Sequence, residues 1–480
     1  MILKRIFEWL WPGKSKVDEP RTTERINDAN SITEQGYDSE KIDRNEAAKE
    51  SVQIIIGFDF GTAFTKVVLH GAGYKFAVPL NDDAQGTEGF LLPTCLYECS
   101  TGNLSVKKPK DCQKIHTDLK MKILDGNLDN DTKRRIIIYI AHVLRKSRDW
   151  LMTEQKGVYG NNVLKWAINI GLPTENYENE RLKETYIDLV EEAWYESTNF
   201  PESKDEVVLN DVERKLHRDM INAFPEFVAQ IQGYINSTQR ESGIHVLADV
   251  GAGTIDVTVF IVHQHEGENR HPILAAQVQK FGTIHLAESR CKQQKGQNGW
   301  RPSPQDQLPS CDEFAKRLGV SVQEVENLDE EFKQGIYRQI NSCLQHAHES
   351  QPNQGDWESG VPLMLCGGGA RVKFYETVYF QDVIDLQKRA RHGRALRKSR
   401  FPELGDLNTP GLPKQDYDRL SVAYGLSFDA LNIGEISHPS AFDAKKNTVP
   451  KRTCSRCRGS GGIHITCPKC GGRGFLSISA

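Results

Sequence analysis

Four cysteines near the C-terminus are spaced as two Cys-x-x-Cys pairs, in the segments CSRCRGSG and CPKCGGRG. Each pair can form a tight knuckle with both thiolates pointing one way, and two facing knuckles supply the tetrahedral sulfur set that zinc prefers. The spacing and the neighbouring glycines favour zinc over a single-iron site or a pair of disulfides. The four predicted zinc ligands are Cys454, Cys457, Cys467 and Cys470.

A different chemistry belongs to the segment IIIGFDFGTAFTKVVL at 54–69, which predicts a buried strand, a tight turn and a second strand. In the turn, Gly61 lets the backbone approach a ligand with exposed N–H groups, and Thr62 adds a hydroxyl donor. Lys66 adds a positive charge and Asp59 a carboxylate. These groups suit a magnesium-bound polyphosphate, whereas a glycine in a hairpin taken alone often serves only the turn.

Two further segments repeat this logic. VLADVGAGTIDVTVFIV at 246–262 again predicts strand, turn and strand, so that two hairpins can enclose phosphates from both sides. Asp59 and Asp249 would hold magnesium through its waters, because this ion keeps much of its hydration. In MLCGGGARV at 364–372 a strand runs into glycines and then a helix, and Arg371 could stack on a base.

In this order, the three segments resemble the phosphate-one, phosphate-two and adenosine motifs of the actin-like ATPase superfamily, most closely those of DnaK-type heat-shock chaperones. The resemblance covers about residues 51–435 and extends to LLPTCLYE at 91–98, FPEFVAQ at 224–230 and SVAYGLSF at 421–428. It implies an α/β, two-lobed actin-like ATPase fold made of duplicated ribonuclease-H-like domains. The implied reaction is in-line attack of water on the γ-phosphate of ATP, assisted by Mg²⁺.

The resemblance also implies which residues carry the reaction. The catalytic and magnesium-holding set is Asp59, Lys120, Glu226, Asp249 and Asp256. Lys120 has a rival in Lys122, and Lys66 departs from the chaperone pattern toward that of actin-like filament proteins. The implied nucleotide contacts are Gly61, Thr62, Ala63, Lys66, Gly251, Gly253, Thr254, Gly367, Gly368 and Arg371.

Patterns of polarity divide the 480 residues into five parts. We expect an amphipathic helix at 1–12, a disordered linker at 13–50, the ATPase block at 51–435, a linker at 436–453 and the zinc tail at 454–475. The first helix is too short to span a bilayer, and it either contacts a membrane surface or protein partner or packs on its own domain. Within the block we expect helices at 181–197 and 211–236, buried strands at 246–262 and 362–366, and a loop at 293–309.

Charge and cysteine usage constrain location and partners. The net charge is −4, so the whole chain has no electrostatic bias toward nucleic acid or anionic membranes. The basic run KRARHGRALRKSR at 388–400 lacks interleaved aromatics, so a solvated helical face is favoured over a nucleic-acid contact. Eleven cysteines, the first seven scattered, indicate a reducing cytoplasm, and the protein would be peripheral to a membrane only through its first helix.

Both cysteine pairs also fit Cys-x-x-Cys-x-Gly-x-Gly, the repeat of the zinc-binding domain in DnaJ-type co-chaperones, and two repeats suffice for one zinc. About 45 residues follow the ATPase block, so the peptide-binding domain of the chaperones is not expected. The leading hypothesis is a chaperone-like ATPase switch whose zinc tail or surface insertions contact a partner or unfolded client. The alternatives are an actin-like nucleotide-dependent filament or scaffold protein, a kinase of the superfamily, and an interaction module with a degenerate ATPase.

Overall fold

The computed structural model describes residues 50–173, 179–199, 214–265, 268–291, 303, 307–352, 355–389, 394–400, 404–409, 411–433, 435–437, 451–453 and 475–477. Residues 1–48 form a separate unit of the chain from residues 49–480. The expected N-terminal helix and most of the expected linker after it therefore lie outside the described residues. None of the described helices is long and apolar enough to cross a bilayer.

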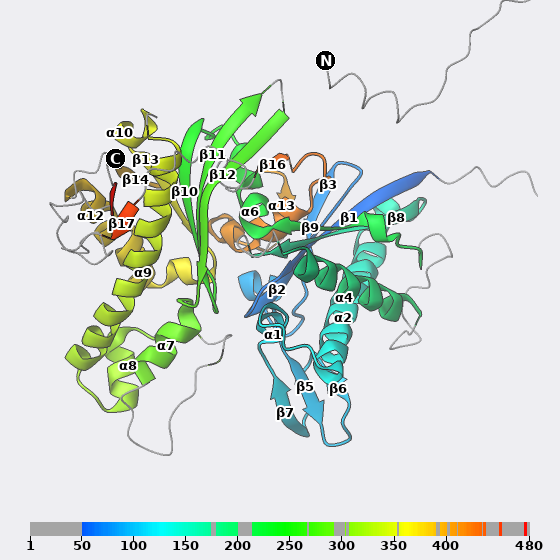
Figure 1. The fold of residues 1–480 in the computed structure, drawn as a ribbon. Helices are drawn as coiled ribbons and strands as arrows, with labels where there is room; N and C mark the ends of the chain where they lie inside the picture. The colour runs from blue at the N-terminus through cyan, green and yellow to red at the C-terminus, as the bar shows by residue number, and fades with distance from the viewer. Residues whose placement is uncertain are drawn as a thin grey trace, which may run out of the picture. The chain divides into compact units, whose positions relative to one another are not determined.

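The first large sheet, with the helices that flank it, forms what we call the first lobe (Figure 1). Its strand order is β15-β3-β2-β1-β8-β9, with β4 paired to β2. The apolar run of the first strand is buried from Ile54 to Phe60 because helices and neighbouring strands cover it on all sides. The bounds are β1 (Ser51–Phe60), β2 (Phe64–Gly71), β3 (Tyr74–Ala77), β4 (Leu92–Pro93), β8 (Val163–Leu172), β9 (Ile221–Pro225) and β15 (Leu407–Asn408).

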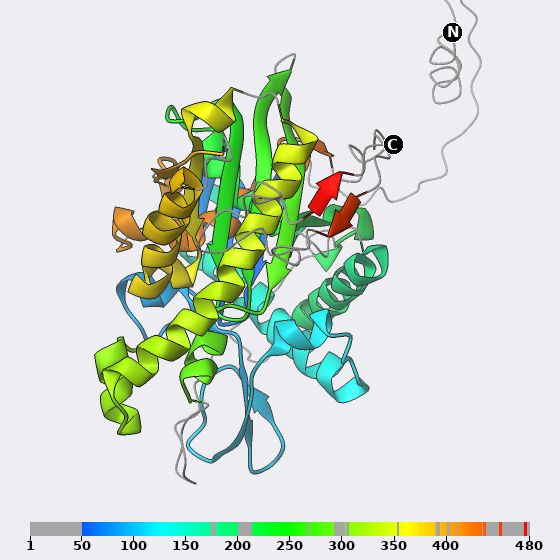
Figure 2. The same cartoon turned by 60° about the vertical axis from the view of Figure 1, so that its left-hand side comes forward.

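The second large sheet, in the second lobe, has the order β14-β13-β10-β11-β12-β16. Figure 2 shows its long helix α9 lying across the strands β11 and β12, with which it is in contact. The strand bounds are β10 (Gly243–Val250), β11 (Ile255–His265), β12 (Glu268–Gln279), β13 (Val361–Cys366), β14 (Leu396–Ser399) and β16 (Glu435–Ser437).

The two sheets repeat one connectivity. In each, the first three strands along the chain pair antiparallel, and two later strands, β8 and β9 or β13 and β14, add in parallel on the other side of the first strand. The edge strands next to the third strand of each sheet also correspond, because β15 pairs in parallel with β3 and β16 pairs in parallel with β12. The α/β fold and its duplication, both expected from the sequence, are therefore present.

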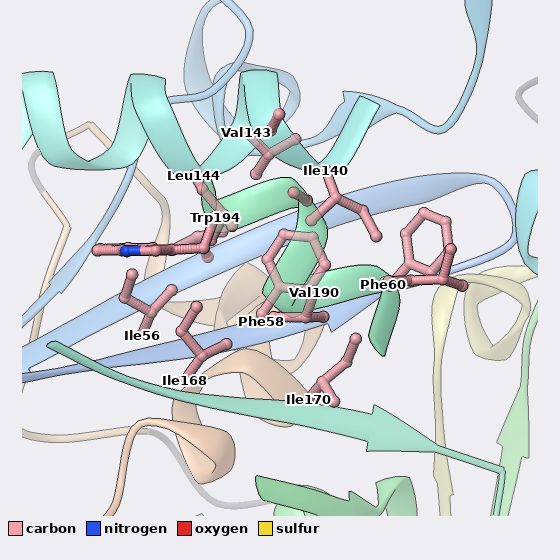
Figure 3. Close-up of a cluster of buried hydrophobic side chains, with 14 of the residues drawn as sticks. Ile56, Phe58, Phe60, Ile140, Val143, Leu144, Ile168, Ile170, Val190 and Trp194 are labelled. Atoms are coloured by element: carbon pink, nitrogen blue, oxygen red, sulfur yellow. The ribbon is translucent and has the colours of Figure 1, made fainter. Parts of the chain in front are cut away.

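The core of the first lobe lies between its sheet and two long helices, α2 and α4, which pack side by side (Figure 1). Figure 3 shows Ile56, Phe58 and Phe60 of β1 and two isoleucines of β8 facing side chains of these helices. The helices of this lobe are α1 (Leu119–Leu124), α2 (Asn130–Glu154), α3 (Lys156–Tyr159) and α4 (Glu180–Asn199). Helix α6 (Glu226–Ile235) follows β9 directly, and its apolar side chains pack against the second sheet.

The second lobe repeats the helical connections with longer insertions. Capping boxes at Ser310 and Ser321 start two of its helices. Its helices are α7 (Thr283–Cys291), α8 (Cys311–Leu318), α9 (Val322–Ser350), α10 (Asp356–Ser359), η4 (Gly368–Arg371), α11 (Lys373–Thr377), the π-helix η5 (Val378–Val383) and α12 (Ile384–Arg389). Later in the chain, η6 (Lys414–Leu420) and α13 (Ser421–Leu426) return to pack against the first sheet. The first lobe has its own insertion, the small sheet β6 (Leu104–Ser105), β5 (Leu96–Cys99) and β7 (Cys112–His116), and the short turns η1 (Gly86–Phe90) and η3 (Arg218–Met220).

Of the helices and strands expected within the described part of the ATPase block, all but one are confirmed. Helix α4, the strands β10 and β11, and strand β13 lie where the sequence predicts them. The helix expected at 211–236 is wrong over residues 215–225, because β9 occupies Ile221–Pro225 and α6 begins only at Glu226. The alternating burial of INAFP is that of a strand, and Pro225 is well placed to precede a helix.

Helices α6 and α13 close the two lobes against each other. A Cβ added to Gly425 of α13 would lie 1.7 Å from the Ala229 carbonyl oxygen of α6. One added to Gly57 of β1 would lie 2.2 Å from the Ala423 carbonyl oxygen. Glycine is therefore required at both positions for this close approach of backbones.

Candidate functional site

The two glycine turns of the duplicated sheets lie next to each other. The first joins β1 to β2 and the second joins β10 to β11, where the Gly251 amide donates to the Thr254 carbonyl at 2.9 Å. A Cβ added to Gly253 would lie 3.4 Å from the Thr62 methyl group. The turns thus form two walls of one site, as their sequences predict.

Equivalent register positions carry different charges in the two lobes. Asp59 lies opposite Lys66 in the pair β1–β2, whereas Asp249 lies opposite Asp256 in the pair β10–β11. The first pair is a contact of 2.6 Å between Lys66 Nζ and Asp59 Oδ2. The first lobe therefore offers a neutralised acid and the second lobe two acids.

The third glycine segment packs directly behind Asp249. Gly367 has φ +81°, and a Cβ there would lie 2.0 Å from Asp249 Oδ1. Glycine is needed both for this backbone conformation and for the contact. The segment then continues through the 3₁₀ turn η4 into α11, the predicted strand, glycines and helix.

A cavity of about 1040 Å³ lies between these segments. The predicted residues that line it are Asp59, Gly61, Thr62, Ala63, Lys66, Lys120, Glu226, Asp249, Gly251, Thr254, Asp256, Gly368 and Arg371. Gly253 and Gly367 lie behind this lining, against Thr62 and Asp249 respectively. The structure therefore gathers the predicted residues of the ATPase block at one place, although their roles stay predictions.

Lys120, rather than its rival Lys122, is the lysine that enters the site. It is buried and donates a short hydrogen bond from Nζ to Glu226 Oε1, while Lys122 is exposed. Burial acts to lower the pKa of Lys120, but Glu226 outweighs this effect and the pKa is raised. Helix α1 begins directly after its N-cap residue Asp118, which adopts the left-handed conformation with φ 61°.

Two of the four predicted acids form no ion pair with a lysine. Lys66 pairs with Asp59 and Lys120 with Glu226, which leaves Asp249 and Asp256. Burial, followed by Glu226 and Asp59, raises the pKa of Asp249 to about 7, and burial, Glu226 and Asp249 raise that of Asp256. The Asp256 Oδ1 atom is buried without a hydrogen-bond partner.

This excess of buried negative charge fits a divalent cation. Among the described residues no three His, Cys, Asp or Glu side chains converge closely enough to bind a metal directly. The site therefore suits an ion that keeps most of its water ligands and binds few carboxylates directly, as magnesium does.

The cavity lining also includes residues and contacts that the sequence did not disclose. Arg371 lines it, but its guanidinium is held by Asp416 and Asp418, each at 2.5 Å, which restricts the stacking role expected for it. Glu330 and Lys333 of α9, an i,i+3 pair at 3.3 Å, face the same cavity, as does Gln230 of α6. Their only sequence signal is helical spacing, which many surface pairs share.

Other predicted residues do not join this site. The four zinc-ligand cysteines lie outside the described residues, as does most of the loop expected at 293–309. In the described part of the basic run, Arg397 contacts Glu241, Lys398 contacts Glu376 at 3.5 Å and Arg394 is buried. The solvated helical face expected for the run is therefore wrong for most of its described part, because only Lys388 and Arg389 lie in helix α12 and Leu396–Ser399 form strand β14. Whether the run contacts nucleic acid stays a prediction.

Comparison with known proteins yields likenesses only among solved structures. No protein-family model matches the chain, and no curated protein matches its sequence. MreB5 of Spiroplasma citri bound to ADP is similar with a TM-score of 0.42 and 14% identity, over 83% of this chain and 99% of that one. MreB5 of the same organism bound to AMPPNP has a TM-score of 0.41 and 14% identity, over 78% of this chain and 94% of that one. A non-polymerisable quadruple mutant of pCBH ParM has a TM-score of 0.40 and 15% identity, over 78% of this chain and 98% of that one. At TM-scores below 0.5 we rest no conclusion on these likenesses.

Proposed function

We propose that this protein binds magnesium and ATP in the cavity between its lobes and hydrolyses the ATP. One observation carries the proposal: two equivalent glycine turns meet at a cavity, and of the four predicted acids beside them only Asp59 and Glu226 are paired with a lysine. The backbone N–H groups of such turns suit phosphates, and the unbalanced acids suit the accompanying divalent ion.

The residues take distinct parts in this reaction. Asp59 and Asp249 hold the hydrated magnesium, which neutralises phosphate charge when bound. Glu226, held by Lys120, orients the water that attacks the γ-phosphorus as the bond to the β,γ-bridging oxygen breaks. ATP and water thereby yield ADP, phosphate and a proton, and positioning accounts for most of the rate enhancement.

The test is ATP turnover and nucleotide binding by the full chain and by Asp249→Ala. We expect magnesium-dependent release of phosphate from the wild type, reduced about 10²-fold or more in the variant. Equal rates in the two proteins, or no ATP binding by the wild type, would sink the proposal.

We further propose that the nucleotide controls the assembly of an actin-like filament or scaffold, rather than a chaperone-like switch. Lys66, the residue that departs from the chaperone pattern, lies in the cavity wall against Asp59 and so can sense the nucleotide. The chaperone hypothesis rests on motif resemblance and on a tail outside the described residues. Sedimentation with ATP, ADP or no nucleotide distinguishes the two, since a filament protein pellets in a nucleotide-dependent manner and Asp249→Ala alters that dependence.

The tail and the first helix are proposed contact regions. We propose that Cys454, Cys457, Cys467 and Cys470 bind one zinc, because strands β17 (Lys451–Thr453) and β18 (Phe475–Ser477) pair on either side of them. We further propose a protein partner or unfolded client for this tail, and a membrane surface or partner for residues 1–12. A cytoplasmic location fits these proposals.

A further inference from the structure

Gln230 is a buried side chain that faces the cavity and has no partner. It lies in α6 one helical turn after Glu226, so the two side chains share one face of the helix. It is 1% exposed and lines the cavity. Its Oε1 atom is buried without a hydrogen bond, and its amide makes no hydrogen bond to any described residue.

The other buried glutamines of the described residues each donate a hydrogen bond from Nε2, although the Oε1 atoms of Gln339 and Gln387 are without a partner, like that of Gln230. Gln232, in the same helix, donates from Nε2 to the Val228 and Ile433 carbonyls at 3.3 and 3.0 Å. Gln339 donates to the Ile255 and Gln277 carbonyls, and Gln387 donates to Asn341. None of these three lines the cavity, so Gln230 differs from them in its place in the cavity wall and in an amide that donates to no described residue.

A buried amide without partners is unfavourable unless a ligand supplies them. The groups that would enter this part of the cavity under the proposed function are water and phosphate oxygens. A carboxamide fits both, because its oxygen accepts from a water O–H while its nitrogen donates to an oxyanion. It is also neutral, so it adds no repulsion toward phosphate beside Glu226, Asp249 and Asp256.

We propose that Gln230 is a further water-positioning residue of the hydrolysis reaction. Its Oε1 accepts a hydrogen bond from the attacking water that Glu226 also orients, and its Nε2 donates to an oxygen of the γ-phosphate. The two bonds hold the nucleophile and the phosphorus in line, which is where phosphoryl transfer gains most of its rate. The proposal rests on the ATPase function proposed above.

The experiment compares full-length wild type with Gln230→Met, which keeps the length of the side chain and removes both hydrogen-bonding atoms. We expect kcat to fall about 10²-fold while KM and ADP affinity stay within about threefold. Binding of ADP with aluminium fluoride, a mimic of the transferring phosphoryl group, weakens by a similar factor of about 10². Gln230→Glu, which keeps the shape but removes the donor, should also lose turnover and guards against misfolding of the methionine variant.

Gln232→Met is the matched control, since it removes an equally buried amide of α6 that does not face the cavity. It should lower the melting temperature but leave kcat per folded molecule unchanged. An unchanged kcat in a folded Gln230 variant overturns the inference, as does a parallel loss of kcat and ADP affinity. If the wild type turns over ATP and Asp249→Ala does not, such a result leaves the ATPase proposal standing, whereas an inactive wild type overturns both.

Discussion

Lys120 is the residue on which the charge balance of the site depends most. It is one of two lysines among four buried or half-buried acids and contacts Glu226 directly. Replacing it with methionine leaves Glu226 beside Asp249 and Asp256 with no cation of its own. We expect Lys120→Met to lower ATP turnover about 10²-fold or more and to destabilise the fold by about 3 kcal/mol.

Lys122→Met is the control for this change, because Lys122 is exposed two residues further along the same helix. It should leave turnover and stability near wild type. Phosphate release and urea denaturation measure both effects. The reverse pattern, with Lys122 essential and Lys120 dispensable, would contradict the assignment.

Among the site residues, those next to the glycine turns could be predicted from the sequence, whereas those that reach the site only through tertiary packing could not. The acids of the glycine turns were predictable, because Asp59 and Asp249 lie next to the last residue of a buried strand and Asp256 lies at the start of the strand after the turn. The choice between Lys120 and Lys122 was open, since it depends on which face of α1 meets Glu226. Gln230 gave no signal, because a glutamine in an apolar helix has the same spacing whether or not it meets a cavity.

The crossing of α6 and α13 is the element on which the relation of the lobes depends. Gly425→Ala would place a methyl group 1.7 Å from a carbonyl oxygen of α6, and neither backbone can yield cheaply. We expect a loss of stability at or above the upper end of the roughly 1–3 kcal/mol typical of overpacking. Gly405→Ala is the control, because nothing lies within 4 Å of its added Cβ, and it should stay within about 0.5 kcal/mol of wild type.

Strand β10 carries a histidine that makes the stability depend on pH. His245 is 0% exposed, with Nε2 3.0 Å from the Tyr234 hydroxyl and Nδ1 2.9 Å from the Gly243 carbonyl. Burial, partly offset by the Gly243 carbonyl and Glu241, lowers its pKa from 6.5. Above pH 6.5 it is neutral in both states, but as the pH falls below 6.5 only the unfolded chain takes up the proton and stability is lost.

This histidine contributes a loss of up to about 1.4 kcal/mol per pH unit, until the pH reaches its folded-state pKa. His245→Phe keeps the ring next to Phe260 and removes the titration. Urea denaturation between pH 7 and 5 should therefore give a flatter curve for this variant than for the wild type. Exposed His346→Gln should follow the wild type, and parallel curves for all three proteins would rule out His245 as a source of the slope.

The elements themselves were predictable where one pattern dominates. Buried apolar runs beside glycine turns gave the strands β1, β2, β10, β11 and β13. The error at 211–236 arose because the strand β9 is short and adjoins α6 without a linker. A five-residue strand gives little periodicity, and its identity is settled by pairing with β8, a contact distant in sequence.

On the scale of the whole molecule, the duplicated sheets explain why one site forms between them. The same connectivity used twice brings two equivalent turns to a common cavity, with a lysine in one lobe where the other has an aspartate. The two turns could be predicted from the sequence. The full correspondence between the strands of the two sheets could not, because β14 and β15 are too short to be recognised by pattern.

The zinc tail is the part whose independence from this site can be tested directly. Thr453 pairs with Phe475, so the segment that holds all four predicted ligands is closed by its own two-stranded sheet. Such a closed unit should bind metal without help from the ATPase lobes. We expect about one zinc per chain in the wild type and a small fraction of that in the double variant Cys457→Ser, Cys470→Ser. Cys99→Ser, which alters a half-exposed cysteine elsewhere, should retain the full amount.

Zinc content by mass spectrometry should be read together with ATP turnover in the same preparations. Because all the described residues that line the cavity precede Phe428, we expect the double variant to hydrolyse ATP at the wild-type rate while lacking zinc. Full zinc in that variant would refute the ligand assignment, and bound iron or a disulfide in the wild type would refute the choice of metal. Turnover that fell in proportion to zinc would instead mean that the tail acts on the nucleotide site, because metal binding stabilises only the parts of the chain that it orders.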